Sequence, residues 1–475
     1  MKIKVIASTK VGYVLPKEEA IDFSGKSAGI CYLPDTVETL FAEAPEKTQR
    51  RANGNLESGH HSVFGHAHYN LIFEGIPKIL AMILNNEKIY NTSEKSARYT
   101  KMEPSEEEKV LYEKWIEKYK KVIKEEYPEF DDKKVQKLAQ ENARYLISVF
   151  TPATIMEYTV SFEQLNFIIS WFEDYIENEP ETGFSVQLKK AMKEFLEALP
   201  DLKVEKLNPR VKKTKLSLFA TRDRKEEFGE NYCTTYLASF AQLAQAQRHR
   251  TLSYEMSLLD KPEYYVPRII RGTELEKEWL EDISSLDKYY PQGMLVKVNE
   301  RGTVENFVLK CTERLCGAAQ LEIMEQTVET MNKYLEAVKN YPNIENYLLG
   351  NYESGGYLLL VPNNENAVFK IIGDTGSVIG ITCYTDTTFS NLCPFDSYYL
   401  PSGRNFYSAS LTKNVTTNRT FKKSSAFYYS DFDVLYADGT VFFQKPLLGI
   451  TETLVVETNK AQIAEQLKKI ITGFL

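Results

Sequence analysis

The sequence predicts an α+β protein built from three parts. Two stretches, residues 105–126 and 133–149, place apolar side chains at helical spacing with Lys and Glu on the opposite face. After residue 341 the composition changes, and Gly, Thr, Ser, Tyr and Phe become more frequent. Short strand-like runs in this later region are separated by turn pairs such as Asp438-Gly439. We therefore expect two helix-rich parts with few strands, followed by a β-rich third part.

The first two parts are separated by a charged connector. The first part, residues 1–204, begins with an alternating run that is typical of a strand. The connector follows Pro200 and leads into the second part, residues 205–340. In this second part, an apolar run over residues 236–246 predicts a buried helix, and the spacing over residues 308–339 predicts another.

The third part, residues 341–475, has its own pattern. Strand-like runs occur at residues 357–361, 426–429 and 441–444, and the spacing over residues 460–474 predicts a closing helix. No motif in this part indicates a chemical role. We therefore predict a β-rich C-terminal module whose contribution to the protein stays open.

Composition and charge narrow the class of protein. Hydrophobic residues make up 43% and charged residues 26% of the 475 residues, values that are ordinary for a globular protein. The formal net charge of −8 argues against a general nucleic-acid binder, which would carry a basic surface. No run approaches the roughly 18 apolar residues of a membrane span, and the first residues lack the apolar core of a signal peptide. We therefore expect a cytoplasmic protein that binds neither nucleic acid nor membrane.

The most specific chemical feature is the basic run Arg248-His249-Arg250, which follows the apolar run over residues 236–246. Its charges would therefore emerge at the end of a rigid element. Two guanidiniums and an imidazole beside a core are costly unless something pairs with them. Guanidinium binds phosphate bidentately and stacks on planar rings, so the run predicts a site for a polyanionic ligand. Neutralisation by local Glu and Asp side chains is the alternative.

The segment from Gln245 to Ser257 resembles the signature of the flavin-dependent thymidylate synthases, which contains Arg-His-Arg followed by a spaced Ser. The spacing here is one residue shorter than in the family, and Leu258-Leu259-Asp260 replaces the family's small residue, Arg and Tyr. Further on, the run from Arg314 to Ile323 resembles the family's Arg-Leu-x-x-x-Ala-Gln-x-Glu-Ile. The alternative for Arg314 is an ordinary position on a helix surface.

The first part resembles the same family by different residues. Residues 59–66 resemble its Gly-His-x-Ser/Thr-Pro-Phe-Glu-His, residues 93–99 resemble its Asn-Glu-x-Ser-x-Arg-Tyr, and Ala143-Arg144 resembles its Ala-Arg. However, Asn85-Asn86-Glu87 stands where Arg-His-Arg is expected. The second part has the opposite losses, with Asp223 where the family's His falls. Each part therefore lacks what the other retains.

These complementary losses predict two fused and diverged synthase-like halves, each with helices and a small antiparallel sheet. Since the family binds its nucleotide between subunits, the two halves are expected to share one site. The resemblance implies that Arg314 is catalytic, stabilising charge on the uracil. It implies a dUMP site formed by Gln245, Arg248, Glu94, Ser96, Ala97, Arg98 and Arg144. It implies an FAD site formed by His60, Ser62, Arg248, His249, Arg250 and Glu94.

The reaction that the resemblance implies is the reductive methylation of dUMP to dTMP. FAD would be the cofactor, and NADPH and methylenetetrahydrofolate the co-substrates. Because family members are homotetramers, two fused halves predict a homodimer that forms a pseudo-tetramer. Two alternatives stay open. One is a flavin-dependent C5 modification of another pyrimidine nucleotide, such as hydroxymethylation, and the other is a binding or structural protein on a decayed scaffold.

Four of the five histidines fall within nine residues: His60, His61, His66 and His68. Such a cluster could bind zinc. However, the adjacent pair and the alternating pair point in different directions, and Asp or Cys ligands are absent nearby. We therefore expect no metal. His60 is expected at the flavin, and the other three in packing or supporting positions.

Overall fold

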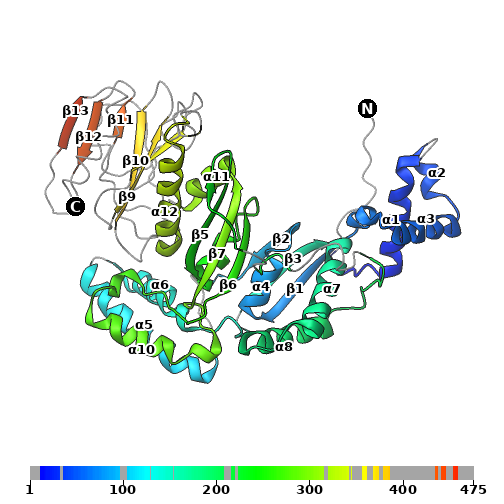
Figure 1. Ribbon diagram of the computed structural model, residues 1–475, viewed down its shortest axis with the longest axis horizontal. Helices are drawn as coiled ribbons and strands as arrows, with labels where there is room; N and C mark the ends of the chain where they lie inside the picture. The colour runs from blue at the N-terminus through cyan, green and yellow to red at the C-terminus, as the bar shows by residue number, and fades with distance from the viewer. Residues whose placement is uncertain are drawn as a thin grey trace. The chain divides into compact units, whose positions relative to one another are not determined.

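The computed structural model describes residues 11–32, 36–96, 104–128, 130–152, 154–207, 216–219, 223–314, 319–341 and 344, and the backbone of six strands between residues 356 and 457 (Figure 1). The chain divides into two compact units. Unit 1 comprises Met1–Lys109, Ile147–Thr221 and Lys288–Tyr290. Unit 2 comprises Val110–Leu146, Arg222–Asp287 and Pro291–Leu475.

Unit 1 is built around a three-stranded antiparallel sheet of order β1-β3-β2. Buried residues alternate along β3, as expected for a strand with one covered face. The apolar helix α4 connects β1 to β2, and α7 follows β3 directly, capped by the Ser161 side chain. The elements are β1 (His68–Ile76), α4 (Lys78–Leu84), β2 (Tyr90–Glu94), β3 (Thr154–Ser161), α7 (Phe162–Asn178) and α8 (Gly183–Ala198).

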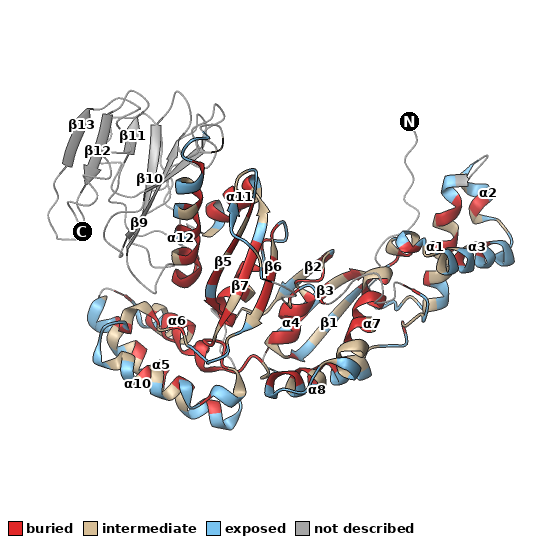
Figure 2. Cartoon of the chain, in the orientation of Figure 1, coloured by how far each residue is buried: buried red, intermediate tan, exposed pale blue. Residues whose placement is uncertain are grey.

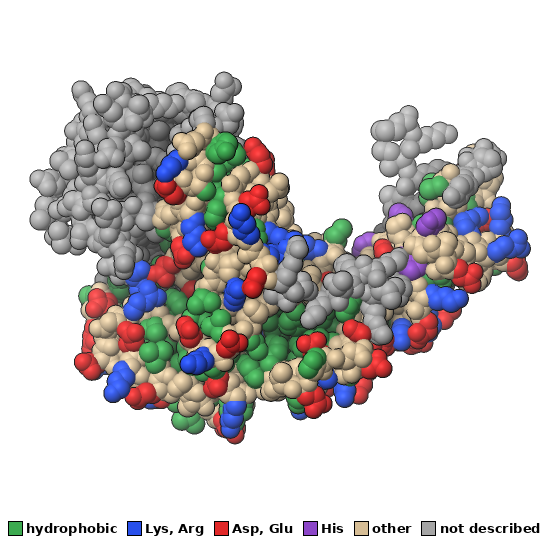
Figure 3. Space-filling view, viewed as in Figure 1, with side chains coloured by type: hydrophobic (Ala, Val, Ile, Leu, Met, Phe, Trp, Pro, Cys, Tyr) green, Lys and Arg blue, Asp and Glu red, His purple; other side chains and the backbone are tan. Residues whose placement is uncertain are grey.

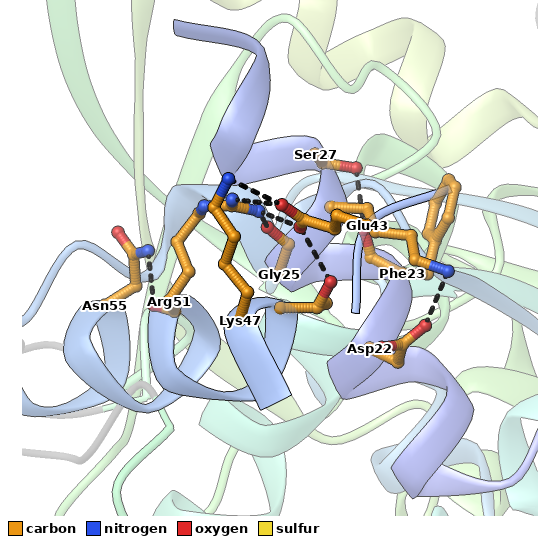
Figure 4. A network of polar contacts seen from close by, with 10 residues as sticks. Asp22, Phe23, Gly25, Ser27, Glu43, Lys47, Arg51 and Asn55 are labelled. Carbon is orange, nitrogen blue, oxygen red and sulfur yellow. Dashed lines mark hydrogen bonds and ion pairs between the residues drawn. The ribbon is translucent and has the colours of Figure 1, made fainter. Parts of the chain in front are cut away.

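The first helices of unit 1 pack closely on one another. They are α1 (Lys17–Gly29), α2 (Val37–Phe41) and α3 (Pro45–Ser58), followed by the short 3-10 helix η2 (His61–Gly65). A Cβ at Gly29 would lie 2.4 Å from a methyl carbon of Leu40, so a larger residue there would displace the Leu40 side chain. Arg51 donates to Glu43 at 2.7 and 2.8 Å and to the Gly25 carbonyl at 2.8 Å, which joins α1 to α3 (Figure 4). The Arg51 guanidinium lowers the pKa of Glu43 to about 2.

Unit 2 has a four-stranded antiparallel sheet of order β4-β5-β7-β6. Its strands are β4 (Glu227–Phe228), β5 (Asn231–Ser239), β6 (Ser253–Leu258) and β7 (Leu295–Thr303), and its helices are α6 (Asp132–Ala143), α9 (Phe240–Ala246), α10 (Glu274–Ser284), α11 (Val304–Arg314) and α12 (Leu321–Val338). Figure 2 shows the buried residues along α12 and β7. α5 (Glu106–Glu126) begins in unit 1 and continues into unit 2, where Trp115 meets Trp279 of α10 edge to face.

The two sheets have the same topology. In each, a nine-residue strand is followed by a seven-residue helix and an outer strand. A helical excursion then leads to a central strand, which pairs antiparallel with both earlier strands. A helix follows the central strand in both units, α7 in unit 1 and α11 in unit 2. The order β1-β3-β2 in unit 1 therefore corresponds to β5-β7-β6 in unit 2.

Several predicted helix boundaries need correction. Residues 236–239 belong to β5, and α9 begins only at Phe240 because the Ser239 hydroxyl accepts the amide hydrogen of Gln242. The helix predicted over residues 308–339 is two helices, α11 and α12, because Gln320 has an extended backbone. The helix predicted over residues 133–149 ends at Ala143 and tightens into a 3-10 turn.

Strands β8–β13 in the third part pair into a six-stranded antiparallel sheet of order β13-β12-β11-β10-β9-β8. They are β8 (Gly356–Leu360), β9 (Ala367–Gly373), β10 (Val378–Thr385), β11 (Val434–Tyr436), β12 (Thr440–Gln444) and β13 (Thr453–Glu457). The predicted strand at 426–429, the closing helix at 460–474 and the first strand at 1–7 lie outside the described residues. The module as a whole stays a prediction.

The domain boundaries predicted from the sequence do not coincide with the boundaries of the two compact units. Residues 110–146 precede the predicted boundary at residue 204, yet they pack within unit 2.

Among the described residues, no helix is both long and apolar enough to cross a membrane.

Candidate functional site

The Arg-His-Arg run lies in the turn that follows α9 in unit 2. The helix ends at Ala246, and Gln247 forms its C-cap. Arg248 and Arg250 are exposed, whereas His249 between them is only 4% exposed. The run therefore points two cations outward and turns its imidazole into the core.

His249 contacts Arg314, the last residue of α11. The Arg314 Nε–H donates to His249 Nε2 at 2.6 Å. Burial, together with the nearby positive charges of Arg314 and Lys310, lowers the pKa of His249 from 6.5 to about 2. His249 is therefore neutral near pH 7. Because Nε2 accepts, the ring proton lies on Nδ1, on the side of the Glu313 carboxylate at 3.7 Å.

A buried ion pair anchors α11 one turn before Arg314. Lys310 donates to Glu300 of β7 at 2.7 Å, and both side chains are completely buried. The hydroxyls of Tyr232 and Tyr236 on β5 donate to the same carboxylate at 2.7 and 2.6 Å. Because a buried charge pair needs such bonds to offset desolvation, this arrangement fixes α11 against the sheet.

Arg144 belongs to a second buried network in unit 2. Its guanidinium donates to the Gln320 side-chain oxygen, and Gln320 donates to the Tyr145 hydroxyl. Tyr145 donates to Glu322 of α12 at 2.7 Å. Ser239 donates to the same carboxylate through its amide at 2.9 Å and its hydroxyl at 2.8 Å. Burial raises the pKa of Glu322 above its usual value, and these three donors, together with the charge of Arg144, oppose that rise.

Two residues of unit 2 that are predicted to bind the nucleotide each have a buried side-chain atom without a hydrogen-bond partner among the described residues. Arg144 and Gln245 are each 7% exposed. The Arg144 Nε and the Gln245 side-chain oxygen have no hydrogen-bond partner among the described residues. Buried polar atoms are nearly always bonded in folded proteins, so these two atoms are candidates for contact with a ligand or a water molecule.

The predicted site residues of unit 1 are only partly described. His60 and Ser62 are exposed around the start of η2. Glu94 forms an ion pair with Lys78 at 2.5 Å, and Ser96 is half-buried. Ala97 and Arg98 lie outside the described residues.

The histidine cluster differs from the expectation. His61 is buried, with Nε2 at 3.1 Å from the Leu56 carbonyl oxygen, so it packs as predicted. His66 and His68 were expected to pack but are exposed, because the first follows η2 at the surface and the second lies on the uncovered face of β1. Figure 3 shows histidine side chains gathered on one surface. No group of three or more His, Cys, Asp or Glu residues in the described part of the chain could hold a metal ion.

A cavity of about 500 Å³ lies at the start of β5, lined in part by Arg224, Cys233 and Arg301. Its arginines are already paired. Arg224 donates to Glu255 at 2.7 Å, and Arg301 donates to the same carboxylate at 3.2 Å. The arginines of the cavity are therefore largely neutralised by the chain itself.

Sequence reasoning missed the residues that support the site. Gln320 and Glu322 lie in the run from Arg314 to Ile323 that resembles the family, but the resemblance implied no role for either residue. Tyr145 directly follows the predicted ligand Arg144. Lys310 precedes Arg314 by one helical turn between apolar neighbours, a pattern that indicates a paired buried charge.

Comparison with known protein families gives a match, and it lies in the first part of the chain. Residues 18–169 match the family described as thymidylate synthase complementing protein. This stretch of the chain is similar to that family. The resemblance predicted for the first half is thereby confirmed, whereas the second half lies beyond the matched residues. No curated protein matches the chain.

The match supports an enzyme similar to the flavin-dependent thymidylate synthases, which use FAD and a folate substrate. The matched stretch contains seven residues for which the synthase resemblance implies a role: His60, Ser62, Glu94, Ser96, Ala97, Arg98 and Arg144. The mixture of helices and small antiparallel sheets agrees with the predicted α+β class.

Proposed function

We propose that the chain catalyses the reductive methylation of dUMP to dTMP, with FAD as cofactor and methylenetetrahydrofolate and NADPH as co-substrates. The observation that carries the proposal is the composition of unit 2. Arg144, from the stretch that is similar to the synthase family, lies in the same compact unit as Gln245, His249 and Arg314. Groups that the family takes from two subunits are thus brought into one folded unit from distant parts of one chain.

Arg314 would act on the uracil ring. Its Nε is held by His249, so its remaining N–H groups would donate toward N3 and O4 as negative charge develops there. A positive group at these atoms would stabilise the uracil enolate, whose negative charge is shared between O4 and C5, the carbon to which the one-carbon unit is added. The guanidinium stays charged throughout, so its effect does not depend on pH.

The two buried ligands with unpartnered atoms would bind the rest of the nucleotide. Gln245 would accept from a ring N–H through its side-chain oxygen, and Arg144 would hold the phosphate with a permanent charge. From unit 1, Glu94, Ser96, Ala97 and Arg98 would complete the phosphate and sugar contacts. Gln320 would hold the Arg144 guanidinium in place.

Arg248 and Arg250 would hold the flavin, because they are exposed cations on a rigid turn and can stack on a ring or bind pyrophosphate. His60, Ser62 and Glu94 would contribute from unit 1. Bound FAD would supply the hydride chemistry. The protein's part is to bind it, orient it and place positive charge beside it.

We further propose that the chain arose by fusion of two synthase-like halves and forms a homodimer. The shared topology of the two sheets supports the duplication, since strand order and helix placement repeat where the sequences have diverged. The complementary loss of site residues supports a single site made by both halves.

Product analysis tests the proposed reaction. Purified protein would be incubated with labelled dUMP, methylenetetrahydrofolate, FAD and NADPH, and we expect labelled dTMP. Arg314→Ala should lower the rate of product formation by about 100- to 1000-fold, whereas Lys277→Ala, at an 84% exposed position on α10, should leave it unchanged. Hydroxymethyl-dUMP in place of dTMP would keep the flavin chemistry and change the product. A protein that binds neither flavin nor dUMP would refute the proposal and favour a binding or structural role.

A further inference from the structure

His249 is placed to act on Arg314 rather than on a ligand directly. Its side chain is only 2% exposed, and the distance from Arg314 Nε to its Nε2 is 2.6 Å, a short charge-assisted hydrogen bond. The flanking Arg248 and Arg250 point outward instead. One short run therefore presents two cations to a ligand and one acceptor to the protein interior.

The imidazole can accept this bond because it is neutral. Arg314 and Lys310 of α11 both oppose its protonation, and burial disfavours the charged ring more than either. The Glu313 carboxylate is half exposed and lies 3.7 Å from His249 Nδ1 and 3.7 Å from a terminal nitrogen of Arg314. Neutral imidazole has one acceptor nitrogen, and here Arg314 uses it.

A bond at Nε constrains the whole guanidinium. The group is planar, so fixing the direction of Nε–H also fixes the direction in which the two terminal nitrogens project. Arg314 ends α11, and the last turn of a helix tends to fray. The Lys310–Glu300 ion pair secures the turn before it, and His249 secures the side chain itself.

We propose that His249 is a positioning residue, whose neutral imidazole accepts the Arg314 Nε–H and thereby orients the guanidinium toward the pyrimidine ring. This inference rests on the proposed function for the identity of the ring. It gives His249 a different role from the flavin contact that the family resemblance implies.

Variants that differ in acceptor ability test this role. His249→Gln retains an oxygen that can accept from Nε, whereas His249→Leu has none. We expect the Leu variant to bind FAD as the wild type does, with kcat lower by about 10- to 100-fold, the effect of one misplaced charge-assisted contact. The Gln variant should recover most of this loss. The matched control, His68→Gln, replaces an exposed histidine on β1 and should leave FAD binding, the dUMP dissociation constant and kcat unchanged.

A double-mutant cycle separates positioning from general stabilisation. If His249 acts through Arg314, then adding His249→Leu to Arg314→Ala should produce no further loss of dUMP affinity by calorimetry or of kcat. Additive losses, or a Leu variant that loses FAD while keeping kcat, would overturn the inference. Should His249→Leu fail to fold, His249→Asn provides the test, because its shorter amide cannot reach Nε.

The wild-type protein distinguishes the two levels of the proposal. If it does not bind dUMP, both the function and the inference fall. If it binds dUMP and forms dTMP while the Leu and Gln variants behave alike, only the role of His249 falls.

Discussion

The two sheets present the same place in the fold in opposite ways. After α4 in unit 1, Asn86 and Glu87 are buried, and they bond to Ser217 of the connector. After α9 in unit 2, the equivalent turn exposes Arg248 and Arg250. The backbone topology is shared, so the difference lies in the side chains. One turn has become a structural contact, and the other is suited to bind an anion.

The outer strands β2 and β6 also differ between the two units, in the ion pairs that their glutamates form. Among the described residues, Glu94 near the end of β2 pairs with Lys78, whereas Glu255 on β6 pairs with Arg224 and Arg301. A carboxylate paired with two guanidiniums is held firmly within the internal structure. The two units therefore use the glutamate of this strand in different ways.

The largest expected effect is on Arg314. Arg314→Ala should lower kcat by about 100- to 1000-fold, since the charge it stabilises develops mainly in the transition state. The dUMP dissociation constant should change far less. Steady-state kinetics and calorimetry on the same preparation measure both. An unchanged kcat would contradict a catalytic role for Arg314 and therefore for unit 2.

Next is the exposed turn of unit 2. Arg250→Ala should weaken FAD binding about 10- to 100-fold, which is the cost of one charge-assisted contact. Flavin fluorescence titration measures the dissociation constant. Lys88→Ala, in the turn after α4 of unit 1, is the matched control. Equal losses in the two variants would contradict the contrast between the units.

The buried imidazole should make unit 2 sensitive to acid. Its folded pKa of about 2 lies below the usual value of 6.5, so the unfolded chain takes up the proton first as the pH falls. Stability is therefore full above pH 6.5 and declines toward pH 2. Between pH 7 and pH 5, wild type should lose about 2 kcal/mol more than His249→Gln. Thermal midpoints at the two pH values would measure the difference, and parallel declines would contradict it.

The smallest expected effect concerns the buried turn after α4 in unit 1, which contains Asn86 and Glu87. Ser217→Ala removes hydrogen bonds to Asn86 at 2.9 and 3.0 Å, which should cost about 1–2 kcal/mol of stability. Flavin content should not change. A lower thermal midpoint with intact FAD binding is expected, and loss of FAD would indicate that this turn also serves a ligand.

The sequence predicts local features well where one pattern dominates. The helix expected over residues 105–126 is α5, because its apolar stripe is long and unbroken. Boundaries fail where apolar residues continue across a change of structure, as between β5 and α9. There the deciding feature is the cap at Ser239, a single hydrogen bond.

The composition of the site depends on contacts that no local pattern contains. Tyr145 and Glu322 are bonded although 177 positions separate them, and this bond helps to bring Arg144 into unit 2. The resemblance identified Arg144 and Arg314 as ligands, but only the folded chain shows that His249 turns inward to Arg314. Burial and tertiary contacts, rather than residue type, set that direction.

The central claim is that both halves of the chain serve one nucleotide site. Calorimetric titration of dUMP into the FAD-loaded protein, with Arg98→Ala from the first half and Gln245→Ala from the second half as variants, tests it directly. We predict one equivalent of dUMP per chain, with both variants weakening that same single site. Two equivalents per chain, or one full-affinity equivalent remaining in either variant, would contradict it.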